Sequence, residues 1–279
     1  MSVISTNVSA LYSQNAMKVN ARDMSSAMQQ LSTGSRINSA KDDAAGLAIG
    51  QSMTSQIRGL NQAVRNANDG VNMMQTAEGA MVEQSNMLQR MRELAVQASN
   101  GTYSSAQRTY LNTEFSALTT QIGKIATETT WNGQKLLDAT NTNSISGTAG
   151  KFEFQSGQAS GQTIGVTITA MTTTGLGITG LGVSTASSAS SAITTIDSAL
   201  DTINNQRATI GAGINQLTYA ADNMTNISSN VAASRSSIMD TDYALASTQL
   251  SKTQIIQQAS TAMLAQANQQ PQSVLALLK

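Results

Sequence analysis

Apolar residues recur at alternating steps of three and four along two long stretches, one in each half of the chain. The first comprises Met53, Ile57, Leu60, Val64, Ala67, Val71 and Met74 and continues at Met81, Leu88 and Ala95. The second comprises Ile193, Ile196, Leu200, Ile203, Arg207, Ile210, Ile214, Leu217, Ala221, Met224, Ser228 and Val231. This spacing places each set on one stripe of a helix, which must be buried against partner helices.

A third, shorter repeat lies between these two and comprises Leu111, Phe115, Leu118, Ile122 and Ile125. We therefore expect three long helices, at about 43–99, 105–130 and 189–238, that bury one another's stripes. The turn signals Asn100–Gly101 and Trp131–Asn132–Gly133 mark the ends of the first two.

Both ends of the chain show apolar residues at helical spacing, separated by Ser, Asn and Gln rather than by charged residues. These residues are Ile4, Val8, Leu11, Met24, Met28 and Leu31 near the N-terminus and Leu250, Ile256, Met263, Leu275 and Leu278 near the C-terminus. With few charge pairs, a helix in either segment would be marginal on its own. Gly34 interrupts the first segment, and Ser39 with Asp42 is expected to cap the next helix.

The middle of the chain has a different pattern. Residues 151–154 and 162–169 alternate apolar with polar side chains, which predicts a β-hairpin. Residues 172–191 are mostly Thr, Gly, Ser and Ala, which predicts a flexible linker without a core of its own.

The predicted fold class is mainly α: a long antiparallel helical bundle or coiled-coil rod formed by the N- and C-terminal halves, with a small β-hairpin region in the middle. We divide it into a terminal helical domain (1–43 and 240–279), a helical rod (44–140 and 190–239) and a short variable region (141–189).

Composition argues against several classes of partner. Sixteen basic and sixteen acidic residues cancel, so no net charge favours nucleic acid or an anionic membrane. No apolar run is long enough to span a bilayer, and the N-terminus lacks the features of a secretory signal peptide. Only 11% of residues are charged, and such a neutral polar surface favours self-association.

The chain contains neither His nor Cys, which removes the usual general base, thiol nucleophiles and zinc-type sites. The acidic pairs Asp42–Asp43 and Asp240–Asp242 are better explained as helix starts than as catalytic carboxylates. We expect no catalytic residue, no cofactor site and no metal site. The charged segment from Arg90 to Glu93 is a solvated helix face by default, yet it is a plausible recognition patch on so neutral a chain.

Several sequence blocks resemble bacterial flagellins. They lie at 4–10, 31–49, 89–101, 131–137 and 274–279, and the likeness covers about 1–140 and 190–279. The resemblance implies that the two terminal helices pair as an inner domain, joined through residues 32–46 to a helical outer rod. It also implies a structural subunit that polymerises with itself into the extracellular filament used for swimming. A related alternative is the hook-filament junction protein.

The resemblance implies further partners. The subunit would be exported unfolded by the flagellar type III apparatus, with a chaperone holding its C-terminal segment, and would assemble under the filament cap and next to hook junction proteins. The terminal stripes named above would order when neighbouring subunits bury them. A flagellin-sensing Toll-like receptor would recognise Gln89, Arg90 and Leu94, with Glu114 on the following helix as a fourth contact. Some relatives of this type carry a zinc protease in the middle region, which the absence of His argues against.

Overall fold

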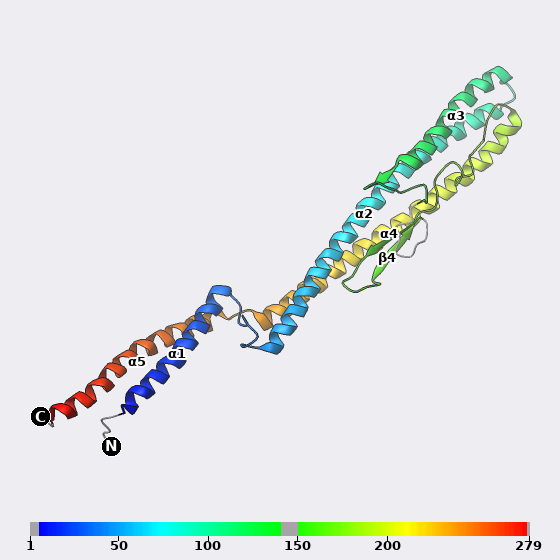
Figure 1. The fold of residues 1–279 in the computed structure, drawn as a ribbon. Coiled ribbons are helices and arrows are strands. Elements are labelled where there is room, and N and C mark those ends of the chain that lie inside the picture. The colour runs from blue at the N-terminus through cyan, green and yellow to red at the C-terminus, as the bar shows by residue number, and fades with distance from the viewer. Residues whose placement is uncertain (1–5, 141–149, 278–279) are drawn as a thin grey trace. The chain divides into compact units, whose positions relative to one another are not determined.

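The computed structural model describes residues 6–140 and 150–277, with side chains described as far as residue 269. These residues form helices α1 (Val8–Thr33), α2 (Ala44–Ser99), α3 (Ser105–Glu128), α4 (Ala186–Met239) and α5 (Tyr243–Leu277). Four short strands lie between α3 and α4: β1 (Thr130–Trp131), β2 (Gln134–Lys135), β3 (Lys151–Gln155) and β4 (Thr163–Thr167). The predicted class, mainly α with a small β region in the middle, is confirmed (Figure 1).

The described residues separate into two compact units. The terminal unit comprises the segment up to residue 57 together with the segment from 229 onward, and the central unit comprises 58–228. The boundaries of these two units differ from those of the terminal domain, rod and variable region expected from the sequence. That three-part division stays a prediction.

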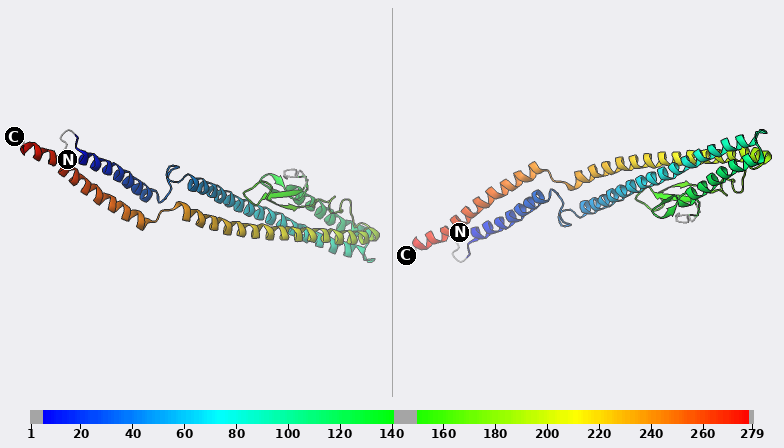
Figure 2. Two further views of the ribbon diagram at one scale, coloured as in Figure 1. Left: turned by 90° about the horizontal axis from the view of Figure 1, so that it is seen from below. Right: turned by 90° about the horizontal axis from the view of Figure 1, so that it is seen from above.

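In the terminal unit, α1 and α5 run antiparallel and side by side (Figures 1 and 2). Their seam is made of small and polar residues: Ala10, Asn20 and Ala27 of α1 and Ala246 and Thr253 of α5 are buried. Larger apolar side chains such as Met17, Met24, Leu250 and Leu264 are only half-buried. Because stability follows the apolar area removed from water, this pair of helices is weakly stabilised by its own contacts.

Specific residues set the end of α1 and the start of α2 in the terminal unit. Gly34 ends α1 with a φ of 71°, which glycine adopts without a steric penalty. The sequence prediction for the start of α2 was wrong in detail: Asp43, not Ser39, caps it, because the Asp43 carboxylate accepts from the Gly46 amide at 2.9 Å. Asp42 instead accepts from the Ser39 amide at 3.0 Å and from the Ser39 hydroxyl at 2.9 Å, which fixes the preceding turn.

In the central unit, α2, α3 and α4 bury their predicted stripes against one another. Met74, Met81 and Leu88 of α2, Phe115 and Ile122 of α3, and Ile196, Ile203 and Ile210 of α4 are all fully buried in one core. The capping box that Ser104 and Gln107 form starts α3 where the sequence predicted it.

The second column of the α4 stripe agrees with the prediction only in part, because Ala221 and Ser228 are buried but the residues before them are less so. Leu200, Arg207 and Ile214 are only half-buried, whereas the adjacent column of Ala199, Gln206 and Gly213 is buried. Val166 of β4 lies against Gly213, and Gln206 hydrogen-bonds to Thr167 at the end of β4 and to Thr169 just beyond it, so these two positions need a missing side chain and an amide. The Arg207 guanidinium lies 3.5 Å from Glu78 of α2 instead of in the core.

The β3–β4 hairpin has the antiparallel register Phe152↔Val166 and Phe154↔Ile164, which agrees with the predicted pattern. A second hairpin, β1–β2, was not predicted as strands. Its turn, Asn132–Gly133, has φ values of 48° and 77°, as the tight turns of two-residue hairpins require.

The segment after β4 is not the flexible linker that its composition suggested. Ile178 and Val183 of the predicted linker are fully buried, and with Ile168 and Met171 just before it they belong to the same core as the three helices. Its backbone is also held by hydrogen bonds: the Met171 amide donates to the Leu137 carbonyl at 2.7 Å, and Gln84 donates to the Met171 carbonyl at 3.0 Å. Four well-spaced apolar side chains are enough to dock a segment onto an existing core.

Across the described part of the chain, no helix has the length and hydropathy needed to cross a membrane. The same residues contain no cluster of three or more acidic, His or Cys side chains that could hold a metal ion.

Candidate functional site

Arg90 of α2 is the centre of an exposed charged cluster in the central unit. Its Nε lies 2.9 Å from Oε1 of Glu114 on α3, and its Nη1 lies 2.9 Å from Oε2 of Glu93 on α2. The hydrogen bond to Glu114, and to a smaller extent that to Glu93, raises the pKa of the Arg90 guanidinium. The cluster therefore presents a fixed pattern of one positive and two negative groups across two helices.

The structure brings together three of the four residues expected to form the receptor patch. Gln89 is exposed beside Arg90, and the Glu114 side chain is half exposed. Leu94 is the exception: it is 1% exposed and its side chain lies in the core of the central unit. The part of Leu94 in receptor recognition stays a prediction, and in this structure its side chain packs in the core.

A neighbouring ion pair was not predicted. Nε of Arg92 lies 2.7 Å from Oδ1 of Asp197 on α4, and this contact raises the pKa of the Arg92 guanidinium. Arg90 and Arg92 thus tie α2 to different helices. The sequence carries no signal for this pairing, because its partners are separated by 105 positions.

The terminal unit leaves most of its predicted stripe exposed. Val8 is 47%, Leu11 51%, Met28 55%, Ile256 38% and Met263 64% exposed. Met24, Leu31 and Leu250 are half-buried along α1 and α5. Ile4, Leu278 and the side chain of Leu275 lie outside the described residues. The exposed residues are apolar side chains that the α1–α5 pair by itself does not cover.

Other large apolar residues on the same helices are exposed as well, namely Tyr12, Val19, Leu245 and Ile255. They were not among the predicted stripe residues. So many exposed apolar side chains on two paired helices are typical of a surface that another protein covers.

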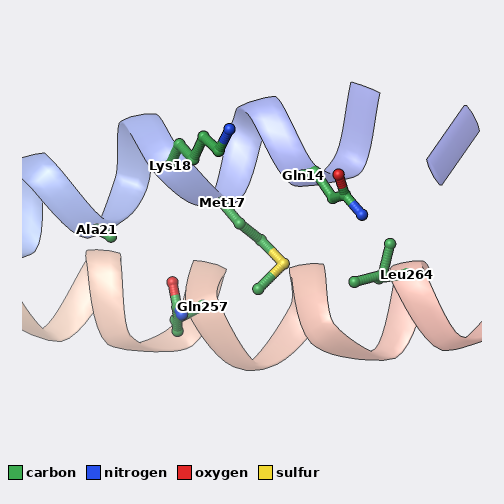
Figure 3. A pocket seen from close by; sticks show the side chains of 6 residues that line it. All are labelled: Gln14, Met17, Lys18, Ala21, Gln257 and Leu264. Carbon is green, nitrogen blue, oxygen red and sulfur yellow. The ribbon is translucent and has the colours of Figure 1, made fainter. Parts of the chain in front are cut away.

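A shallow groove between α1 and α5 shows how the pair is built. It is lined by Gln14, Met17, Lys18 and Ala21 of α1 and by Gln257 and Leu264 of α5. In Figure 3 the Met17 side chain extends to α5 and ends between Gln257 and Leu264. The lining is mixed, with the apolar side chains of Met17, Ala21 and Leu264 beside polar ones.

Close to the groove, Asn20 is buried within the seam. Its Nδ2 donates to the Thr253 carbonyl at 2.8 Å and to Oε1 of Gln257 at 3.1 Å. Asn7 makes a similar contact further along, donating to the Ala267 carbonyl at 2.8 Å while its Oδ1 caps α1. Polar contacts therefore align the two helices along a seam that has little apolar area.

Comparison with protein-family models identifies two regions of the chain. The bacterial flagellin N-terminal helical region matches residues 4–142, and the bacterial flagellin C-terminal helical region matches residues 193–278.

Relatives match over almost their whole length. A flagellin of Halalkalibacterium halodurans is 42% identical over 279 residues, covering 99% of this chain and 100% of the relative. The flagellar filament 30.7 kDa core protein of Treponema maltophilum is 40% identical, covering 99% of each chain. Flagellin B of Vibrio cholerae is 35% identical, again covering 99% of each.

Solved structures agree with these relatives. The crystal structure of Bacillus cereus flagellin is similar with a TM-score of 0.51 and 34% identity, over 61% of this chain and 94% of that one. A putative flagellar hook-associated protein of Vibrio parahaemolyticus shares the fold, with a TM-score of 0.59 at 15% identity, over 71% of this chain and 100% of that one. The chain therefore belongs to the bacterial flagellins, the family of the flagellar filament subunit.

Proposed function

We propose that this flagellin is exported unfolded, that its terminal helices become stably folded only when neighbouring subunits cover them, and that the resulting homopolymer is the extracellular filament used for swimming. The observation that carries the proposal is the exposed apolar surface of α1 and α5, together with the small and polar residues of their shared seam. An isolated pair of such helices buries too little apolar area to offset the conformational entropy lost on folding.

The same surface accounts for the partners expected during export and assembly. Leu245, Ile255, Ile256 and Met263 of α5 are apolar and accessible, which suits a segment that an export chaperone holds before assembly. Cap and hook junction proteins would meet the same helices at the two ends of the polymer. Contacts between identical subunits that do not close into a ring give an open helical filament.

Seeded elongation tests the assembly surface. Met263→Glu places a charge on an exposed apolar position of α5, and Gln266→Glu places the same charge on an exposed polar position of the same helix. We expect Met263→Glu to slow the elongation of filament seeds strongly and Gln266→Glu to leave it close to wild type, as followed by electron microscopy. Equal elongation by both variants would count against this surface. A wild-type chain that never lengthens seeds would favour the hook-filament junction alternative.

We further propose that a flagellin-sensing Toll-like receptor binds the surface formed by Gln89, Arg90 and Glu114. Support comes from the pairing of Arg90 with Glu114, which fixes an exposed guanidinium and carboxylate on adjacent helices. A planar guanidinium held in this way offers directional donors to a partner.

A matched pair of variants tests the receptor surface. Arg90→Ala removes the ion pair with Glu114, and Arg92→Ala removes a comparable exposed ion pair with Asp197. We expect receptor signalling to fall for Arg90→Ala alone, while both variants still form filaments. Signalling that falls equally for both variants would indicate a general loss of structure.

A further inference from the structure

The connection between α2 and α3 contains an Asn–Gly step in an open environment. Asn100 follows the last residue of α2, and both Asn100 and Gly101 are exposed. Within the part of the chain that the structure describes, no atom lies within 4 Å of the position that a Cβ on Gly101 would occupy. Gly101 therefore has no side chain of its own to hinder its backbone nitrogen, and the space beside its Cα is open.

The Asn100 side chain is folded over the backbone that follows it. Its Oδ1 accepts from the Thr102 amide at 3.2 Å, so the side chain turns back along the chain in an Asx turn that spans Gly101. Only three atoms of Asn100, its C, Cα and Cβ, separate the Gly101 nitrogen from the electrophilic amide carbon, so a bond between the two closes a five-membered ring. Proximity of this kind converts a slow reaction between separate groups into an intramolecular one.

We propose that Asn100 is a site of spontaneous covalent modification, in which its side-chain amide is lost through a cyclic imide to give aspartate and isoaspartate. The Gly101 nitrogen gives up its proton to solvent and bonds to Cγ of Asn100. The bond from Cγ to Nδ2 breaks, and ammonia leaves. Water then adds to one of the two imide carbonyls and opens the ring, so that the net change is the gain of one water and the loss of one ammonia.

Arg108 of α3 is placed to stabilise the product. Its Nη2 donates to the Asn100 carbonyl oxygen at 2.9 Å, and its Nε donates to the Ala98 carbonyl at 2.8 Å. In the isoaspartate product the main chain runs through Cγ, and the former main-chain carbonyl of Asn100 becomes a free carboxylate. The guanidinium that faces this carbonyl would then pair with a carboxylate, which is a stronger interaction. The reaction also adds a negative charge to a chain whose formal net charge is zero.

The chain contains a second Asn–Gly step that serves as an internal comparison. Asn132 and Gly133 form the turn of the β1–β2 hairpin, with φ values of 48° and 77°. The strands on either side pair through Thr130↔Lys135 and Trp131↔Gln134. Attack by the Gly133 nitrogen would require Asn132 to leave this left-handed conformation and the pairing to break. Folding should therefore slow the reaction at Asn132 and not at Asn100.

The test uses the full chain, incubated folded and in denaturant at mildly alkaline pH. Mass spectrometry of peptides follows the conversion at both asparagines, and isoaspartate-specific methylation separates the two products. We expect the two sites to react at similar rates in denaturant, and Asn100 to react several times faster than Asn132 in the folded chain. Faster or equal conversion at Asn132 in the folded chain would overturn the proposal.

Two variants complete the experiment. Gly101→Ala fits the open space and should slow conversion at Asn100 severalfold without changing Asn132. Arg108→Ala should lower the share of isoaspartate among the products. Conversion at Asn100 that is unchanged by Gly101→Ala would exclude attack by this backbone nitrogen.

Discussion

Val166 of β4 lies directly over Gly213 of α4, so closely that a Cβ on Gly213 would come within 2.5 Å of the Val166 Cγ2 methyl. The helix therefore needs a residue without a side chain at this position, although glycine inside a helix costs about 1 kcal/mol relative to alanine. Close approach of the hairpin to the helix buries Val166 at 3% exposure and compensates for this cost.

Gly213→Ala should destabilise the central unit. The added methyl group would meet three atoms of Val166 within 3.5 Å, so the whole side chain must move and the hairpin with it. Overpacking of this kind costs about 1–3 kcal/mol, which exceeds the gain in helix propensity. Denaturant unfolding followed by circular dichroism would measure the loss.

Gly211→Ala is the matched control, two residues away on the same helix. No described atom lies within 4 Å of a Cβ at Gly211, so only the helix propensity changes. This variant should be more stable than wild type by about 0.5–1 kcal/mol. If the two variants had the same effect, close contact with Val166 would not be the reason for glycine at 213.

Gln206→Ala should loosen the hairpin without disrupting α4. The buried Gln206 amide donates to the Thr167 carbonyl at 2.8 Å, and its Oε1 accepts from the Thr169 amide at 3.2 Å and the Thr169 hydroxyl at 3.0 Å. Its removal takes away hydrogen bonds to Thr167 and Thr169, which are exposed residues that water can reach, so we expect a cost of about 0.5–1.5 kcal/mol for each bond. Hydrogen exchange should increase at 163–169 and not in α3. Gln216→Ala, at an exposed position of α4, should have no effect on this segment.

Heptad spacing predicted which helices pair but not every residue at the interface. It correctly placed Ile203 in the core, yet it missed Ala199, Gln206 and Gly213, because spacing rules select large apolar side chains. Where the hairpin packs on α4, the helix instead needs small side chains that leave room for the hairpin, as Gly213 does for Val166. The packing of Ile178 and Val183 in the predicted linker was missed for a related reason: composition does not reveal that a few apolar residues can dock onto an existing core.

The charged patch shows a similar limit. Helix spacing alone cannot pair Arg90 with Glu114, because they lie on different helices. The resemblance to flagellins placed both residues in one receptor patch but did not predict their ion pair. Leu94 could have been recognised as buried, since it lies three residues after Met91 and four before Ala98, on the same stripe of α2. The exposed apolar residues of the terminal unit could be placed on helices, but their exposure required the structure.

Acid should loosen the turn before α2. Hydrogen bonding from Ser39 lowers the pKa of the Asp42 carboxyl below its ordinary value of about 4. A carboxyl with a lowered folded pKa contributes stability above its unfolded pKa and loses it as the pH falls through the folded pKa. Amide exchange at 38–42, corrected for its intrinsic pH dependence, should therefore increase below about pH 4. Asp42→Asn should abolish this change, and a variant that retained it would point to another group.

Asn20→Leu should stabilise the pairing of α1 with α5 and make its register less specific. A single buried asparagine in a coiled-coil seam selects one register at a cost in stability, and here Asn20 finds its partners at Thr253 and Gln257. With leucine in its place, amides of both helices should exchange more slowly in the monomer. Asn15→Leu, at an exposed position of α1, should not have this effect. Exchange that becomes faster would mean that the polar contact is the main stabilising interaction of the seam.

Engineered disulfides can measure the register of α1 against α5 in the Asn20→Leu variant, because the chain has no cysteine of its own. Ala27 lies one heptad after Asn20, and Ala246 lies one heptad before Thr253, so the same antiparallel register brings these two buried residues together. Ala27→Cys with Ala246→Cys should cross-link efficiently in assembled wild-type filaments. Adding Asn20→Leu should lower this yield and raise that of Ala27→Cys with Thr253→Cys, which reports a shift of one heptad. Unchanged yields from both pairs would show that other contacts, such as the Asn7 amide with the Ala267 carbonyl, set the register without Asn20.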